Sequence, residues 1–148
     1  MSTGSIHNVL YIATTTQRVW DALTNPDVTE RYWFGTRMES DWRVGSTLSY
    51  VVRGRTTDEQ TIVASDPPHR LAYTFHPLAE PFVREAPSRV EFTIDERDGV
   101  VRLTVLHDGF PPGSAVLPAC TGAWPKILSG LKSLLETGRS LPALEFAD

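Results

Sequence analysis

The sequence contains a single cysteine, Cys120, among its 148 residues, so no disulfide bond can form within the chain. A lone thiol fits a reducing compartment, and we expect the protein to be cytoplasmic. Residues 1–5 lack a basic segment followed by an apolar run, which predicts no secretory signal. No hydrophobic run approaches the roughly 20 residues that a transmembrane helix needs, so we expect no membrane span.

The sequence also lacks any concentration of positive charge. It has 14 Lys and Arg residues against 18 Asp and Glu residues, a formal net charge of −4. The basic residues are scattered along the chain, whereas proteins that bind nucleic acids usually present a basic stripe or patch. We therefore expect no nucleic-acid partner.

Motifs typical of catalysis and metal binding are missing as well. The four histidines do not have the spacing of metal ligands, and neither a Gly-x-Ser-x-Gly motif nor a glycine-rich phosphate loop occurs. Cys120 lies on the apolar face of a predicted helix and is interpreted as a small core residue. The sequence thus predicts no metal, no cofactor and no assigned catalytic residue.

What the sequence does contain is a long amphipathic segment near its end. Apolar residues recur at steps of three and four from Cys120 to Leu135, which predicts one face of a helix. Gly138 follows at the position of a left-handed C-cap, and Ser114 is a candidate N-cap. The length of the chain and its 41% hydrophobic content predict a single domain over residues 1–148, with a core over about 6–141.

Most of the preceding sequence alternates between apolar and polar residues, which is typical of antiparallel strands with one buried face. Two short helices are predicted after the first strand. Thr14 or Thr15 caps the first, and Asn25 followed by Pro26 begins the second, which runs to Trp33. A twisted sheet of this size needs something to fill its concave face. The predicted strands cover 6–13, 36–42, 47–53, 59–65, 69–76, 89–95 and 101–107.

Together these elements predict an α+β fold, in which a curved antiparallel sheet of about six to seven strands wraps around a long C-terminal helix. Four stretches carry a family resemblance: residues 19–26, 31–34, 42–45 and 124–138. In this order they resemble the Activator-of-Hsp90-ATPase-1-like proteins of the START/Bet v 1-like (SRPBCC) superfamily, which has the helix-grip fold. The resemblance covers about residues 6–141.

This resemblance implies a cavity between sheet and long helix, which in relatives holds lipids, polyketides, plant hormones or other apolar molecules. It does not imply one reaction, because the fold hosts binding proteins, cyclases and chaperone-associated modules. Eight residues are predicted to line the ligand site. Three supply polar groups and five supply apolar walls: Tyr50, Tyr73 and His107, then Trp33, Phe75, Phe92, Trp124 and Leu128.

Several of these residues have two interpretations. His107 shares the inward strand face and is either a hydrogen-bond donor or acid at the mouth of a pocket, or a satisfied, half-buried histidine beside a turn. The hydroxyls of Tyr50 and Tyr73 bond either a ligand carbonyl or a backbone carbonyl. Trp33 is a gate or ligand wall, or it packs on the sheet edge, and Trp124 is either core or cavity lining.

The predicted surface gives fewer indications of function. The charges of Arg53, Arg55, Asp58 and Glu59 are interpreted as a solvated hairpin tip. The leading hypothesis is a protein that binds a hydrophobic small molecule. The alternatives are a cyclase- or hydrolase-type enzyme that uses His107 or a tyrosine as acid or base, and a chaperone-associated module that binds a protein partner. A homodimer is compatible with all three.

Overall fold

The computed structural model describes residues 4–141, so both ends of the predicted domain, 1–3 and 142–148, lie outside the described residues. Within this range one antiparallel sheet has the strand order β1-β7-β6-β5-β4-β3-β2. Its strands are β1 (Ile6–Ile12), β2 (Thr36–Ser40), β3 (Thr47–Val52), β4 (Arg55–Asp66), β5 (Arg70–Phe75), β6 (Ser88–Arg97) and β7 (Val100–Asp108). The helices are α1 (Thr16–Thr24), α2 (Pro26–Tyr32), the 3-10 helix η1 (Phe82–Arg84) and α3 (Val116–Thr137).

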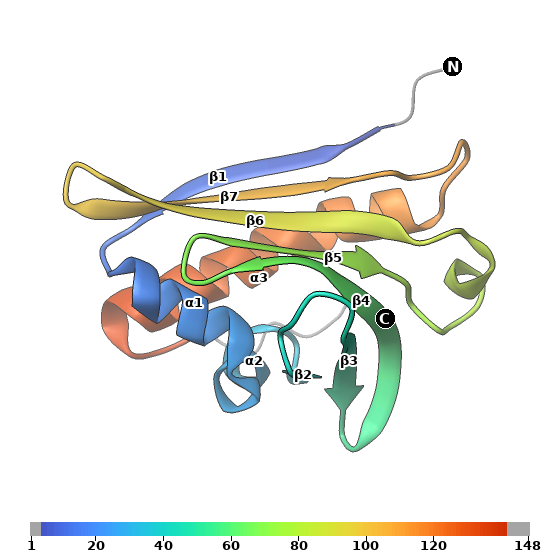
Figure 1. Cartoon of the computed structure of the whole chain (residues 1–148), viewed down its shortest axis with the longest axis horizontal. Coiled ribbons are helices and arrows are strands. Elements are labelled where there is room, and N and C mark those ends of the chain that lie inside the picture. Colours follow the sequence, from blue (N-terminus) through green and yellow to red (C-terminus); the bar gives the residue numbers. More distant parts are fainter. Residues whose placement is uncertain (1–3, 142–148) are drawn as a thin grey trace.

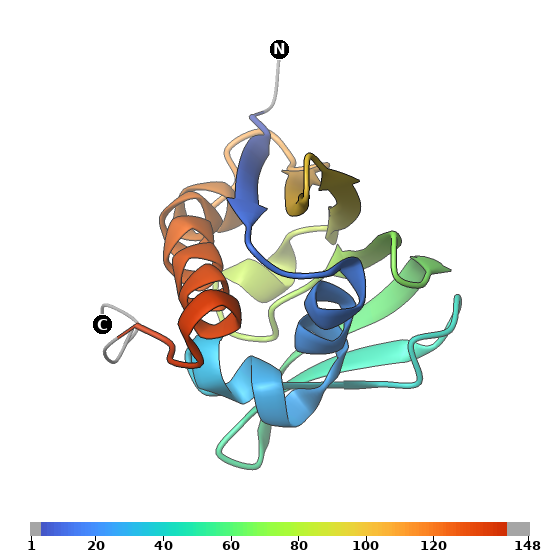
Figure 2. The ribbon, with the colours of Figure 1, turned by 90° about the vertical axis from the view of Figure 1, so that its left-hand side faces the viewer.

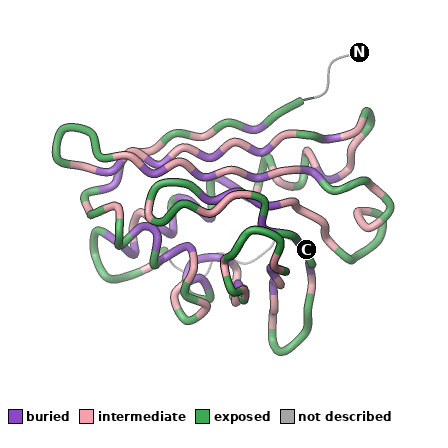
Figure 3. The backbone as a smooth tube through the Cα atoms, in the orientation of Figure 1, coloured by how far each residue is buried: buried purple, intermediate pink, exposed green. Residues whose placement is uncertain are grey.

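The sheet curves around α3, as the sequence predicted (Figure 1). The view along the molecule shows α3 on the concave side of the sheet, with α1 and α2 closing one end (Figure 2). Buried and less buried residues alternate along β6 and β7 (Figure 3). Val90, Phe92 and Ile94 of β6 are fully buried, as are Leu103 and Val105 of β7. The alternation therefore places one face of the sheet in the core.

The two short helices begin where the sequence supplies caps. Of the two candidate caps for α1, the structure uses Thr15, whose side chain accepts a hydrogen bond from the N–H of Arg18 at 3.2 Å. Asn25 caps α2 by accepting from the N–H of Asp27 at 2.9 Å, and Pro26 takes the first helical position. Both arrangements satisfy N–H groups that a helix leaves unpaired at its start.

The long helix is held at both ends. Ser114 Oγ accepts from the N–H of Leu117 at 3.1 Å, while the carboxylate of Glu85 accepts from the N–H groups of Ala115 and Val116 at 2.6 and 3.2 Å. Ser114 thus contributes to the cap as predicted, but much of the cap comes from Glu85, just after η1. Gly138 ends the helix at φ 81°, in the left-handed conformation that glycine adopts without strain.

The β3–β4 hairpin differs from its prediction at one important residue. The turn is confined to Arg53 and Gly54, with φ values of 52° and 77°, so pairing resumes at Arg55 and β4 is longer than expected. Asp58 therefore lies within the strand on its inward face and is only 8% exposed. The predicted solvated tip is correct for Arg53, Arg55 and Glu59, which are exposed, and wrong for Asp58.

The burial of α3 generates a test of the fold. Leu131 of α3 is fully buried, and Leu131→Asp would place an unpaired charge in the core at a cost of several kcal/mol, comparable with the whole stability of a domain. We expect this variant not to fold. Ser129→Asp, on the exposed side of the same helix, should shift the free energy of unfolding by no more than about 0.5 kcal/mol. A cooperative melt of Leu131→Asp close to that of the wild type would contradict the arrangement.

Candidate functional site

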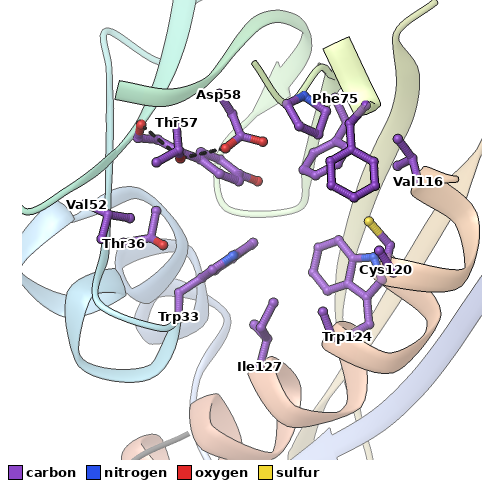
Figure 4. Close-up of a pocket in the computed structure, with 15 residues that line it drawn as sticks. Trp33, Thr36, Val52, Thr57, Asp58, Phe75, Val116, Cys120, Trp124 and Ile127 are labelled. Carbon is purple, nitrogen blue, oxygen red and sulfur yellow. Dashed lines mark hydrogen bonds between the residues drawn. The ribbon is translucent and has the colours of Figure 1, made fainter. Parts of the chain in front are cut away.

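A pocket of about 360 Å³ lies between the N-terminal half of α3 and the inner face of the sheet (Figure 4). From α3 it is lined by Val116, Cys120, Ala123, Trp124 and Ile127, among others. Several of these side chains are small, so the helix leaves space where it passes the sheet. The pocket reaches the molecular surface, because Ala119 lines it and is exposed.

The opposite wall is formed by β3, β4 and β5. Its lining includes Tyr50 and Val52 of β3, Thr57 and Asp58 of β4, and Phe75 of β5. The pairing register shifts at Tyr50/Val51 between β3 and β4, and again at Ile62/Ala64 between β4 and β5. Such irregularities bend a strand and increase its twist. They account for the curvature of this part of the sheet around the pocket.

Four aromatic side chains form a connected group along the pocket. Trp33, just after α2, lies edge-to-face on Trp124 with ring centroids 5.5 Å apart and on Tyr50 at 5.8 Å. Tyr50 in turn contacts Phe75, with centroids 6.1 Å apart. These distances fall in the range preferred by aromatic pairs. The group joins the end of α2, α3 and the sheet, so the aromatic residues that line the pocket belong to three separate parts of the fold.

These four aromatic residues are all among the eight predicted site residues. The other four, Tyr73, Phe92, His107 and Leu128, lie outside the lining. Tyr73, Phe92 and His107 are fully buried, and Leu128 is nearly so. Inward strand parity and helix periodicity identify a core-facing side chain, but they do not distinguish a residue that touches the pocket from one that packs behind it.

The two tyrosine hydroxyls form a hydrogen bond with each other. The hydroxyl oxygens of Tyr50 and Tyr73 are 2.6 Å apart in a buried hydrogen bond. This bond uses the proton of one hydroxyl, so the partner that the structure shows is a second side chain, whereas the sequence suggested a ligand carbonyl or a backbone carbonyl. Burial raises the pKa of both phenols above the ordinary value for tyrosine, so both remain neutral.

His107 is satisfied, although it is neither half-buried nor at the mouth of the pocket. It is fully buried, and Trp124 donates its indole N–H to His107 Nδ1 at 3.1 Å. Because an indole nitrogen can only donate, Nδ1 carries no proton and the imidazole proton resides on Nε2. His107 Nε2 then donates to Ser88 Oγ at 2.8 Å. Burial lowers the pKa of His107 to about 3.

Asp58 is a lining residue that the sequence analysis missed. One carboxylate oxygen, Oδ1, accepts from Thr57 Oγ1 at 2.6 Å, and Figure 4 shows the group beside the open space. Burial raises the pKa of Asp58, opposed by the Thr57 hydrogen bond and by the charge of His76. Asp58, Gln60 and Ile62 alternate with exposed residues and share the buried face of β4. A hairpin turn predicted at Arg53-Gly54 would have extended this alternation to Asp58 and identified it as inward-facing.

Cys120 packs against the core, as the sequence predicted, and it also lines the pocket. Its burial is intermediate, because the neighbouring side chains leave the pocket open on one side. Burial raises the pKa of the Cys120 thiol to about 12, so it is protonated at neutral pH and weakly nucleophilic. Cys120 therefore serves as a small apolar side chain in the wall of the pocket.

Within residues 4–141, no three His, Cys, Asp or Glu side chains gather where they could hold a metal ion. In the same part of the chain, no helix combines the length and the apolar character that crossing a membrane requires.

A curved antiparallel sheet that grips a long C-terminal helix, with an apolar pocket between the two, defines the class of helix-grip α+β proteins. The sequence profile of the family described as "Activator of Hsp90 ATPase homolog 1-like protein" matches residues 13–136. The chain therefore belongs to this family, within the SRPBCC superfamily, as its motifs predicted. A search of curated proteins finds no match.

Solved structures with the same fold come from distant relatives. An Aha1 dimer from Colwellia psychrerythraea superposes with a TM-score of 0.76 at 17% identity, covering 93% of this chain and 100% of that one. A protein from Mesorhizobium loti gives 0.78 at 20% identity, covering 89% and 96%. An Hsp90 activator from Plasmodium falciparum gives 0.72 at 17% identity, covering 88% and 95%. At these identities the likeness shows the fold alone.

The buried imidazole predicts a specific pH dependence of stability. Because the pKa of His107 falls from 6.5 to about 3 on folding, the unfolded chain binds a proton between these values that the folded chain does not. The contribution of His107 to the free energy of unfolding is therefore complete above pH 6.5 and decreases on acidification. Between pH 7 and pH 5 this free energy should fall by about 2 kcal/mol.

Chemical denaturation across this pH range should show that loss in the wild type, and a correspondingly weaker dependence in His107→Leu. Leu128→Ala is the matched control, because it destabilises the same core without removing a titratable group and should keep the wild-type dependence. Equal dependence in wild type and His107→Leu would contradict the assignment.

Proposed function

We propose that the protein binds an apolar small molecule in the pocket between α3 and the sheet. The pocket itself carries the proposal, because its volume of about 360 Å³ falls within the roughly 300–1,000 Å³ of small-molecule sites. Such sites are mostly apolar, with a few polar groups that fix the orientation of the ligand. Here the aromatic group of Trp33, Tyr50, Phe75 and Trp124 supplies apolar wall, while Thr57 and Asp58 supply polar atoms.

The hydrophobic effect supplies the driving force. Transfer of apolar surface out of water contributes about 25 cal/mol per Å², and the aromatic contacts hold the walls in place without a ligand. A preformed pocket avoids much of the cost of ordering side chains on binding. Membership of a superfamily whose fold hosts ligand-binding proteins is consistent with this proposal, but the pocket of this chain is its basis.

The contacts of His107 disfavour the enzyme alternative. Its Nδ1 accepts from Trp124 and its Nε2 donates to Ser88, so His107 cannot take the Ser88 proton without losing the Trp124 bond. The hydroxyls of Tyr50 and Tyr73 are bonded to each other. The residues proposed as acid or base are therefore occupied by structural hydrogen bonds.

The outer face of the sheet gives little support to a protein-interaction module. It carries ion pairs, among them Arg70–Glu91 at 2.6 Å and Arg102–Asp95 at 3.3 Å. The exposed apolar residues Val9 and Tyr11 lie on β1, far in strand order from Val63 on β4. Contiguous apolar patches mark protein interfaces, whereas scattered residues do not.

The single thiol provides a direct test of ligand binding. Because Cys120 is the only cysteine in the sequence and lines the pocket, a bound molecule should shield it from methyl methanethiosulfonate. We expect decan-1-ol, a neutral apolar probe, to slow this modification saturably, as followed by intact mass spectrometry. Modification that stays equally fast at saturating decan-1-ol would refute binding at this site.

A pair of α3 variants assigns the effect to the pocket. Ala123 lines the pocket, so Ala123→Leu should fill part of it and weaken decan-1-ol binding about tenfold. Ser129→Leu adds an apolar side chain to the exposed side of the same helix and should leave binding unchanged. Equal effects of the two variants would place the alcohol elsewhere.

A further inference from the structure

In the described part of the chain, the lining of the pocket contains one carboxyl group and no lysine, arginine or histidine. Of the described residues that line it, Asp58 is the only one with a carboxyl, ammonium, guanidinium or imidazole group. Asp58 Oδ1 accepts from Thr57, and among residues 4–141 no lysine or arginine forms an ion pair with Asp58. His76 lies outside the lining, and its Nε2–H donates to the carbonyl oxygen of Val83 at 3.1 Å. The carboxyl group thus forms no ion pair within the lining, although the charge of His76 acts on it from outside.

A buried carboxyl group in this setting is costly for the protein. Removal from water disfavours the ionised form, and the usual compensation is a paired cation or several hydrogen bonds. Asp58 has one strong hydrogen bond, from Thr57, and its pKa is raised by burial. A hydrophobic residue of similar size would avoid this cost, so the carboxyl group is best explained by what it can bind.

The aromatic walls favour the same kind of ligand. A cation within about 6 Å of an aromatic face is attracted by the ring quadrupole, and cages of aromatic side chains bind ligand ammonium groups in this way. Trp33, Tyr50, Phe75 and Trp124 all line the pocket that contains Asp58. Their mutual ring-centroid distances of 5.5 to 6.1 Å keep them in one connected group.

We infer that the pocket selects an apolar molecule with a single basic nitrogen, held as an ammonium ion against Asp58, with its apolar body between the aromatic rings and α3. This inference rests on the proposed function, since it names the chemical class of the ligand for the same pocket. A primary alkylamine is protonated at neutral pH, much as lysine is. Its ammonium group supplies the charge and the donors that Asp58 lacks.

The same geometry discriminates against other amphiphiles. A fatty-acid carboxylate would bring a second negative charge to Asp58, and two neighbouring carboxyl groups cannot both remain ionised without cost. A neutral alcohol can donate one hydrogen bond but brings no charge. We therefore expect affinity to fall from alkylamine to alcohol to carboxylate at constant chain length.

Three probes of one chain length test this order: decylamine, decan-1-ol and decanoate. Their affinities for the wild-type protein are measured at pH 7 by protection of Cys120 and by calorimetry. We expect decylamine to bind at least about tenfold more tightly than decanoate, because hydrogen bonds to charged groups are the stronger class. Decanoate binding as tightly as decylamine would overturn the inference without any variant having to fold.

Two variants then assign the selectivity. Asp58→Asn keeps the shape of the side chain and should weaken decylamine binding about tenfold while leaving decan-1-ol within about twofold. Glu59→Gln removes the same charge from the neighbouring, exposed position on β4 and should change neither affinity. Equal loss of decylamine binding in both variants would indicate a general effect of net charge and would contradict the role of Asp58.

The outcomes separate this inference from the proposed function. If neither decan-1-ol nor decylamine binds the wild-type protein, the proposed pocket function itself is refuted. If decan-1-ol binds and decylamine gains nothing from Asp58, the pocket binds apolar molecules and only the preference for an amine is wrong. If the amine preference is present in the wild type and lost only in Asp58→Asn, both proposals are supported.

Discussion

The hydrogen bond from Trp124 to His107 fixes the long helix at one position along the sheet, and the pocket depends on that position. With the bond from His107 to Ser88, it forms a buried chain across α3, β7 and β6, where a low dielectric strengthens each bond. The chain places Cys120 and Ala123, the small residues preceding Trp124, opposite the bent strands β3 to β5. A helix displaced by one turn would bring larger side chains into that space.

Two kinds of buried polar group lie in or beside the pocket. The hydroxyls of Tyr50 and Tyr73 form a hydrogen bond with each other, and His107 has a partner at each ring nitrogen, so these groups specify the packing of the core. Asp58 has a partner on one oxygen only and borders open space. Native proteins satisfy nearly all buried polar groups, so each exception needs an explanation. Within residues 4–141, Thr14 Oγ1, Gln60 Nε2 and Arg102 Nε also lack a partner, but these residues lie outside the pocket lining, where Asp58 lies.

Local sequence patterns predicted the fold well, because each helix and strand is specified by residues close together in the sequence. Alternation gave the strands, Thr15 and Asn25 started the short helices, and Gly138 ended α3. The site was harder to predict because it depends on contacts between distant segments. The alternation along the strands predicted that Tyr73 and Phe92 face inward. It could not show that they pack behind the residues that line the pocket. The position of Asp58 depended on a two-residue turn, because that short turn starts β4 at Arg55 and brings Asp58 into the strand.

The Glu85 carboxylate joins the two sides of the pocket rim. It lies next to η1, whose Phe82 lines the pocket, and it bonds to Ser114, Ala115 and Val116 at the start of α3, where Val116 is also lining. These bonds tie η1 to the first turn of α3, so Phe82 and Val116 stay at a fixed separation while the bonds are intact. For a ligand whose passage requires these two walls to separate, the barrier to breaking the bonds adds to the activation energy of arrival and departure. For such a ligand, Glu85 would lengthen residence time while leaving the equilibrium affinity to the pocket walls.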